Sequence, residues 1–188
     1  MLFVERLKMK IWQLSFDVEN FDMVKPLYEY SVNVLQSFDG RSHTSDWTTL
    51  EVTKIEKSDL PMGDAHNFTF FPIVSKNALD ILFPLISESV EILPVDFSGT
   101  VFYGLNVITV LDAIDYAKSE YKTFRDGKRI MAFQKYCFKS DVVKNVHIFK
   151  ITDEKTRRAF VSEQFKRKVE ETNLTGFCFK LVWDSNEN

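Results

Sequence analysis

The sequence stretch that decides the fold of this 188-residue chain is Asn173-Leu174-Thr175-Gly176-Phe177-Cys178-Phe179-Lys180-Leu181-Val182-Trp183. Four of its apolar side chains alternate with period two: Phe177, Phe179, Leu181 and Trp183. A strand would therefore place all four on one face. Gly176 suits the turn into this strand, because a residue without Cβ accepts backbone conformations that others resist. The stretch predicts a core strand inside a sheet, and it indicates no chemistry.

Two other segments have the apolar spacing of amphipathic helices. The first is expected to begin at Lys76 after the N-cap residue Ser75. Its apolar stripe consists of Ala78, Leu79, Leu82, Phe83 and Ile86. Pro84 should kink or end this helix, because proline lacks a backbone donor and clashes with the preceding turn. The second helix should follow Ser162, with Phe165 and Val169 on its inner face and Asn173 at its end.

Extended segments outnumber these helices. Strands are expected over residues 9–14, 47–55, 90–95, 100–107 and 146–151, with a short extended run over 68–74. The Asp126-Gly127 pair predicts a β-hairpin that joins residues 121–124 to 130–138. Residues 58–67 are predicted to form a loop, and residues 111–115 a short turn or helix. The sum is an α+β fold, with a mixed, mostly antiparallel sheet and two main helices packed against it.

Composition fits a single soluble domain. Apolar residues make up 45% and charged residues 27%, and the 18 Phe indicate an aromatic core. One domain over residues 9–188 is expected, with residues 1–8 as an N-terminal extension, because Met9 could itself be the start. The cysteines Cys137 and Cys178 lie in strand-like runs and should be reduced thiols in the cytoplasm. No stretch is long and apolar enough to predict a membrane span.

The net charge of −3 argues against a general nucleic-acid-binding protein, which would carry a basic field. A metal site is not expected either, because the three histidines are scattered and neither cysteine has a partner at metal-binding spacing. No phosphate-binding loop or dinucleotide-binding glycine pattern occurs. No cofactor is therefore predicted.

Two constellations could support catalysis. Cys137 and His147 could meet as a nucleophile and its base, and Asp112 and Asp115 could act as paired carboxylates. Each has a structural explanation: a buried thiol in a strand is inert, and aspartates in turns often cap backbone groups. An uncharacterised hydrolase or transferase that uses these residues remains the alternative function.

An ordered set of short segments resembles a known family. The segments are residues 9–12, 71–78, 90–95, 105–107, 111–115, 148–150, 160–166 and 174–179, followed by Trp183. Together they resemble the immunity proteins of bacterial polymorphic toxin systems, in a group first defined as a myxobacterial-type domain of unknown function. Residues 1–8 fall outside the resemblance, and Phe71 stands where this group often has Tyr.

The resemblance implies a cytoplasmic protein without enzymatic activity, which binds and neutralises a toxin encoded by a neighbouring gene. The partner would be this cognate toxin, and the acidic charge would suit a basic toxin such as a nuclease. The protein itself is expected to be a monomer or a homodimer. Toxin-contact residues differ between members, so the resemblance assigns none here.

The sequence does offer one candidate contact segment, over residues 16–22. It mixes aromatic and acidic side chains in an irregular stretch, as protein interfaces often do. The candidate partner-binding residues are Phe16, Asp17, Glu19, Phe21 and Asp22. The same composition is also typical of an ordinary solvated face.

Overall fold

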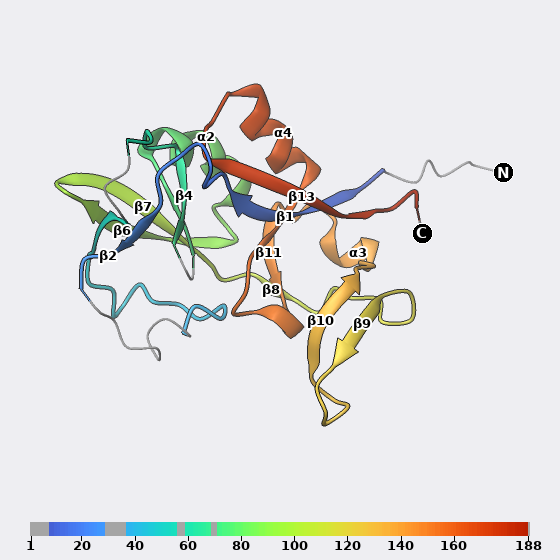
Figure 1. Ribbon diagram of the computed structural model, residues 1–188. Helices are drawn as coiled ribbons and strands as arrows, with labels where there is room; N and C mark the ends of the chain where they lie inside the picture. The colour runs from blue at the N-terminus through green and yellow to red at the C-terminus, as the bar shows by residue number, and fades with distance from the viewer. Residues whose placement is uncertain (1–7, 29–36, 56–58, 69–70, 188) are drawn as a thin grey trace.

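The computed structural model describes residues 8–28, 37–55, 59–68 and 71–187 of the chain. These residues form two larger sheets, a separate two-stranded ribbon and three α-helices (Figure 1). Most strand pairs are antiparallel, and the parallel pairs are β3 with β6 and β8 with β11. The predicted α+β fold with a mostly antiparallel, mixed arrangement is therefore confirmed.

One larger sheet has six strands in the order β2-β3-β6-β7-β5-β4. These strands are β2 (Val24–Pro26), β3 (Leu50–Lys54), β4 (Ala65–Phe68), β5 (Phe71–Val74), β6 (Val90–Phe97) and β7 (Thr100–Val107). The other has five strands in the order β13-β1-β12-β11-β8. These are β1 (Lys10–Phe16), β8 (Val110–Leu111), β11 (Ile148–Ile151), β12 (Phe160–Ser162) and β13 (Phe177–Asp184).

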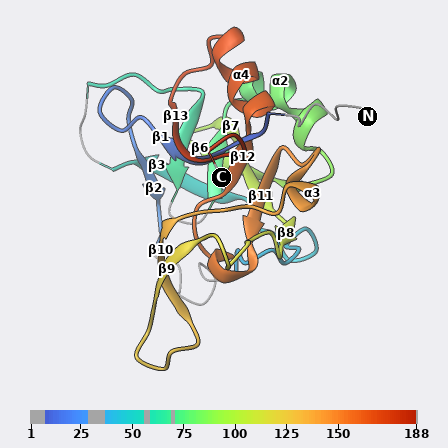
Figure 2. The same cartoon turned by 90° about the vertical axis from the view of Figure 1, so that its right-hand side faces the viewer.

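The ribbon consists of β9 (Glu120–Thr123) and β10 (Ile130–Lys135), which confirms the predicted hairpin. It projects from the body of the molecule in both views (Figures 1 and 2). A 3-10 turn, η1 (Thr152–Glu154), follows β11, and the helices are α2 (Lys76–Ile86), α3 (Ser140–Val143) and α4 (Glu163–Glu171). No helix among these is long and apolar enough to cross a membrane.

Helices α2 and α4 lie together over a core that both larger sheets share (Figure 1). Their N-caps are as predicted: the Ser75 hydroxyl accepts a hydrogen bond from the Ala78 amide, and the Ser162 hydroxyl accepts one from the Phe165 amide, both at 3.1 Å. Helix α2 extends only two residues beyond Pro84. A second core lies under the other part of the five-stranded sheet and contains Phe138, Phe149, Phe160 and Trp183.

Strand β13 differs from the prediction in two ways. It is an edge strand, paired only with β1 among the described strands, so the expected internal position is wrong. Its four apolar residues also do not share one face, because the register with β1 shifts between Ile11 and Trp12. Phe177 and Phe179 pack toward helix α4, whereas Trp183 lies beside Ile11 in the second core. A bulge of this kind reverses the direction of the side chains that follow it.

Three further segments were predicted incorrectly, two of them because their pairing partners are distant in sequence. Strand β4 occupies the end of the predicted loop, paired with β5. Strand β2 was not predicted, and it forms through pairing with β3. Residues 111–115 are extended rather than helical, since Leu111 pairs with Ile151 and Ile114 bridges to Phe138. Residues 1–7 of the expected N-terminal extension lie outside the described residues.

Replacing Gly176 by Ala should lower the free energy of unfolding by about 3 kcal/mol. Gly176 has φ +82°, and a Cβ there would overlap the carbonyl oxygen of Ala65. Gly99 provides a matched control, because its φ is +86° and a Cβ there meets nothing within 4 Å. Gly99→Ala should cost only about 1 kcal/mol, from the left-handed backbone alone. Equal costs in denaturant unfolding would contradict the close contact.

Candidate functional site

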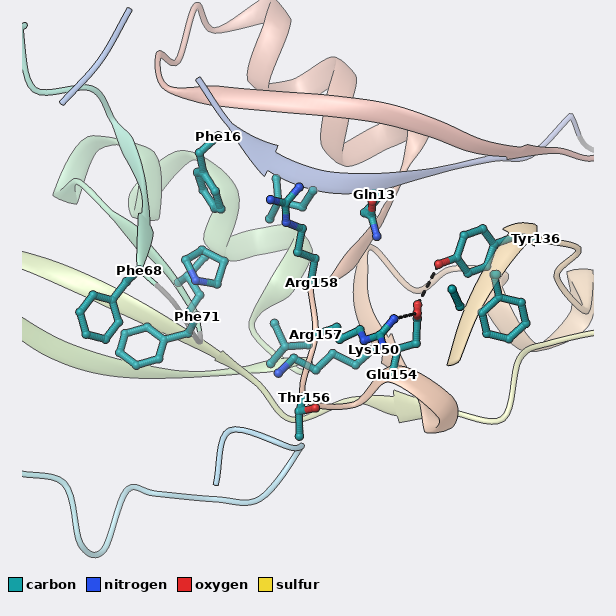
Figure 3. Close-up of a pocket in the computed structure, with 17 residues that line it drawn as sticks. Gln13, Phe16, Phe68, Phe71, Tyr136, Lys150, Glu154, Thr156, Arg157 and Arg158 are labelled. Atoms are coloured by element: carbon teal, nitrogen blue, oxygen red, sulfur yellow. Dashed lines mark hydrogen bonds and ion pairs between the residues drawn. The ribbon is translucent and has the colours of Figure 1, made fainter. Parts of the chain in front are cut away.

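A cleft of about 480 Å³ opens between the two larger sheets. One wall is apolar and largely aromatic, with Phe16, Phe68 and Phe71 among its residues (Figure 3). The opposite wall carries Phe133 and Tyr136, from the ribbon and the segment that follows it. Polar side chains from β11 and from the loop before β12 lie between these walls. The cleft thus combines aromatic walls with a charged floor, a combination typical of binding sites.

Two of the charged groups on this floor, Glu154 and Arg157, bind each other. The Glu154 carboxylate is buried, and it accepts hydrogen bonds from the Tyr136 hydroxyl at 2.8 Å and from Arg157 at 2.7 Å (Figure 3). Burial, together with the Glu154 charge, raises the pKa of the Tyr136 hydroxyl. Arg157 also donates to the Met131 carbonyl at 3.0 Å. Glu154 is therefore engaged as a structural acceptor rather than poised as a general base.

Lys150 is the second buried charge at the cleft. It is 3% exposed, and its ammonium group donates to the Phe38 carbonyl at 2.5 Å. Burial lowers its pKa to about 8, although the nearby Asp39 carboxylate opposes this effect. Lys150 therefore ties the loop around Phe38 to the five-stranded sheet. The sequence signal for this contact is a lysine within the otherwise apolar run Ile148–Ile151.

Arg158 is an exposed cation of the cleft. Its guanidinium extends from the loop before β12 toward Phe16 (Figure 3). Arg158 forms no ion pair with the described residues, whereas Arg157 forms one with Glu154. Such a guanidinium beside an aromatic ring can bind a carboxylate or another anionic group of a partner.

The candidate contact segment, residues 16–22, lies only partly at the surface. Asp17 forms a turn in which its carboxylate accepts from the amides of Glu19 and Asn20, while Val18 and Glu19 are exposed. Asp22 is only 6% exposed and forms an ion pair with Lys54 at 2.5 Å. We call residues 17–19 the acidic turn, because a partner could reach the exposed Val18 and Glu19 and the half-buried Asp17 beside them.

The two aromatic residues of that segment also face inward. Phe16 lines the cleft and packs on the shared core, and the half-buried Phe21 ring lies close to Gly63. Three of the candidate residues therefore make contacts within the fold, which their spacing in sequence did not reveal: Phe16, Phe21 and Asp22.

Among the described residues, no hydrogen bond or ion pair joins Cys137 to His147 or Asp112 to Asp115. Cys137 is buried in the second core, whereas His147 contacts the Ser162 hydroxyl at 2.9 Å. Burial lowers the pKa of His147. Asp112 pairs with Lys139 at 3.4 Å, and the Asp115 carboxylate accepts from the Ala117 amide at 3.2 Å. Each of these side chains thus has a local contact that explains its position.

Within the described ranges, no group of three or more His, Cys, Asp or Glu side chains is placed to hold a metal ion. Both cysteines are free thiols.

Glu91 fixes the loop that Lys150 also holds. Its carboxylate accepts hydrogen bonds from the Ser42 and Thr44 hydroxyls, the His43 amide and the buried Asn106 amide group. Burial alone would raise the pKa of Glu91, but these four donors lower it to about 2. The ionised carboxylate therefore stabilises the loop at neutral pH.

Comparison with protein-family models gives one finding. The model of an immunity protein family (Imm11) matches residues 49–184, which is more than half of the chain and includes the floor of the cleft and the ribbon. Residues 9–12, which also carried the resemblance seen in the sequence, lie outside this match. Comparison with curated proteins gives no match.

Glu91→Gln should reduce stability at neutral pH and flatten its dependence on pH in acid. The folded-state pKa of about 2 lies below the ordinary glutamate pKa of 4.5, so the contribution of Glu91 is complete above pH 4.5 and disappears as pH falls toward 2. Thermal unfolding of wild type and variant between pH 7 and pH 2 tests this. Glu51→Gln, an exposed carboxylate on β3, is the control. Parallel pH profiles for wild type and Glu91→Gln would refute the assignment.

Proposed function

Since the chain belongs to the immunity protein family Imm11, we propose that it binds a cognate toxin in the cytoplasm and neutralises it. The toxin is encoded by a neighbouring gene, and the protein acts by occupancy rather than by turnover. The observation that carries the proposal is the family match over residues 49–184. The cleft supports it, because Glu154 and Lys150 are already committed to internal contacts.

Neutralisation by occupancy requires a stable interface. A specific interface of this kind buries roughly 1,200–2,000 Å² in total and depends on a few aromatic and charged residues. We propose one toxin per chain, with the chain itself a monomer or a homodimer. Neither a cofactor nor a nucleic acid takes part in this binding.

The acidic turn is the proposed contact for a basic toxin, for example a nuclease. Val18 is 43% exposed there and is flanked by the carboxylates of Asp17 and Glu19, so an apolar contact is bordered by negative charge. This arrangement favours association with a positively charged surface. Phe16, Phe21 and Asp22 would support the turn from within.

Expression of the neighbouring gene alone should stop growth of a host cell, and co-expression of this chain should restore it. The two proteins should also co-purify as a 1:1 complex. A chain variant with Phe165→Asp, which places a charge in the shared core, is the folding-deficient control and should not protect. Absence of toxicity from the neighbouring gene, or protection without any complex, would contradict the proposal.

Reversing the charge of the acidic turn with Asp17→Lys and Glu19→Lys should weaken binding of a basic toxin by about tenfold or more. The matched control reverses two exposed carboxylates elsewhere, Glu51→Lys and Glu88→Lys. Circular dichroism should show both double variants folded. Equal affinity of the acidic-turn variant and the control, measured by calorimetry, would remove the turn from the interface.

A further inference from the structure

The ribbon and its flanking turn form an arm, which we define as residues 116–135. The arm extends away from both larger sheets in the two views (Figures 1 and 2). All residues from Glu120 to Arg129 are exposed, including every residue of β9. An isolated two-stranded ribbon is at best marginally stable in water, so its position here depends on how its base is attached.

A row of aromatic rings attaches the arm to the second core. The ring centroids of Tyr116 and Tyr121 are 6.0 Å apart, and those of Tyr121 and Phe133 are 5.8 Å apart. The centroids of Phe133 and Tyr136 are 4.8 Å apart. Tyr136 in turn lies 5.3 Å from the buried Phe160. The hydrogen bond from Arg157 to the Met131 carbonyl fixes the same base. The arm is thus held in one position before any partner arrives, which lowers the entropy cost of binding.

The arm exposes a group of large apolar side chains. Its exposed large apolar side chains are Tyr116, Tyr121, Phe124 and Met131, each between 39% and 42% accessible. Single exposed apolar residues are common, but a group of them on one projecting element is typical of a contact surface. Aromatic side chains are also the residues that contribute most to binding at protein interfaces.

The charge of the arm is opposite to that of the whole chain. The arm has six Lys and Arg residues against two carboxylates, whereas the chain has 24 against 27. Asp126 is already paired with Arg129 at 2.7 Å. Three other cations of the arm form no ion pair with any described residue: Lys122, Arg125 and Lys128. The exposed rings are therefore surrounded by unneutralised positive charge.

We propose that the arm is a docking surface for an acidic patch on the cognate toxin. This inference rests on the proposed function and adds to it the chemistry of one contact surface. Its positive charge selects an acidic patch, and its exposed rings supply the apolar centre of the interface. It is distinct from the acidic turn, which carries the opposite charge and would require the opposite partner surface.

Single-stranded nucleic acid is the other partner that a basic, aromatic surface can bind. The geometry of the rings favours a protein. Base stacking needs open ring faces, but Tyr116 and Tyr121 meet edge to face at 81°, and Arg129 covers the Phe124 ring at 5.0 Å. The overall negative charge of the chain also opposes binding to a phosphate backbone.

The test compares two charge variants of the full chain for binding to the product of the neighbouring toxin gene. The arm variant carries Lys122→Glu, Arg125→Glu and Lys128→Glu, and a separate variant carries Phe124→Ala. The control reverses three exposed lysines outside the arm, with Lys25→Glu, Lys144→Glu and Lys180→Glu. It therefore has the same net charge as the arm variant. Thermal unfolding establishes that all variants are folded.

The arm variant should bind the toxin about tenfold or more weakly and should lose most of its ability to protect host cells. Phe124→Ala should also bind the toxin more weakly. The control variant should bind and protect as the wild type does. If the arm variant bound the toxin with wild-type affinity, this inference would be overturned and the proposed function would stay intact. Failure of the wild-type chain to bind or protect would instead overturn the proposed function and this inference together. A fluorescent oligothymidine provides the last comparison. If the wild-type chain bound it, the arm variant did not, and toxin binding was the same for both, the arm would be assigned to nucleic acid and the proposal overturned.

Discussion

The contact between the two larger sheets at Asp64 and Gly176 is the constraint on which the rest of the structure depends. Asp64 accepts from the Thr175 amide and hydroxyl, both at 3.0 Å, and from the Ser75 hydroxyl at 2.7 Å. Burial alone would raise the pKa of Asp64, but these donors lower it. One carboxylate thus joins the entry to β13, the start of β4 and the N-terminus of α2. Gly176 allows the close approach, because a side chain there would overlap Ala65.

This junction determines where binding surfaces can form. The sheets meet near Gly176 and under α2 and α4, and residues of both sheets line the cleft. The cleft's internal ion pair and the buried Lys150 use their charges for structural contacts. Exposed charge and aromatic surface are found instead on the arm, which the second core holds in place.

The features that the sequence predicted correctly are those governed by local chemistry. Ser75 and Ser162 cap their helices, Asp126-Gly127 turns the ribbon, and Gly176 adopts positive φ. Features that depend on distant partners were missed. The edge position of β13 and its bulge follow from pairing with β1, and the burial of Asp22 follows from its ion pair with Lys54. The cleft is formed by segments from Gln13 to Ala159, so no local pattern could reveal it.

The central claim is that the chain neutralises a toxin by occupying it, without changing it. Titration of the purified chain into the neighbouring gene's toxin, followed by dissociation of the complex and mass analysis, tests this claim most directly. Inhibition should rise linearly to completion at one chain per toxin, and the released toxin should have unchanged mass and full activity. Complete inhibition at a small fraction of one equivalent, or a released toxin with altered mass, would show turnover and contradict the account.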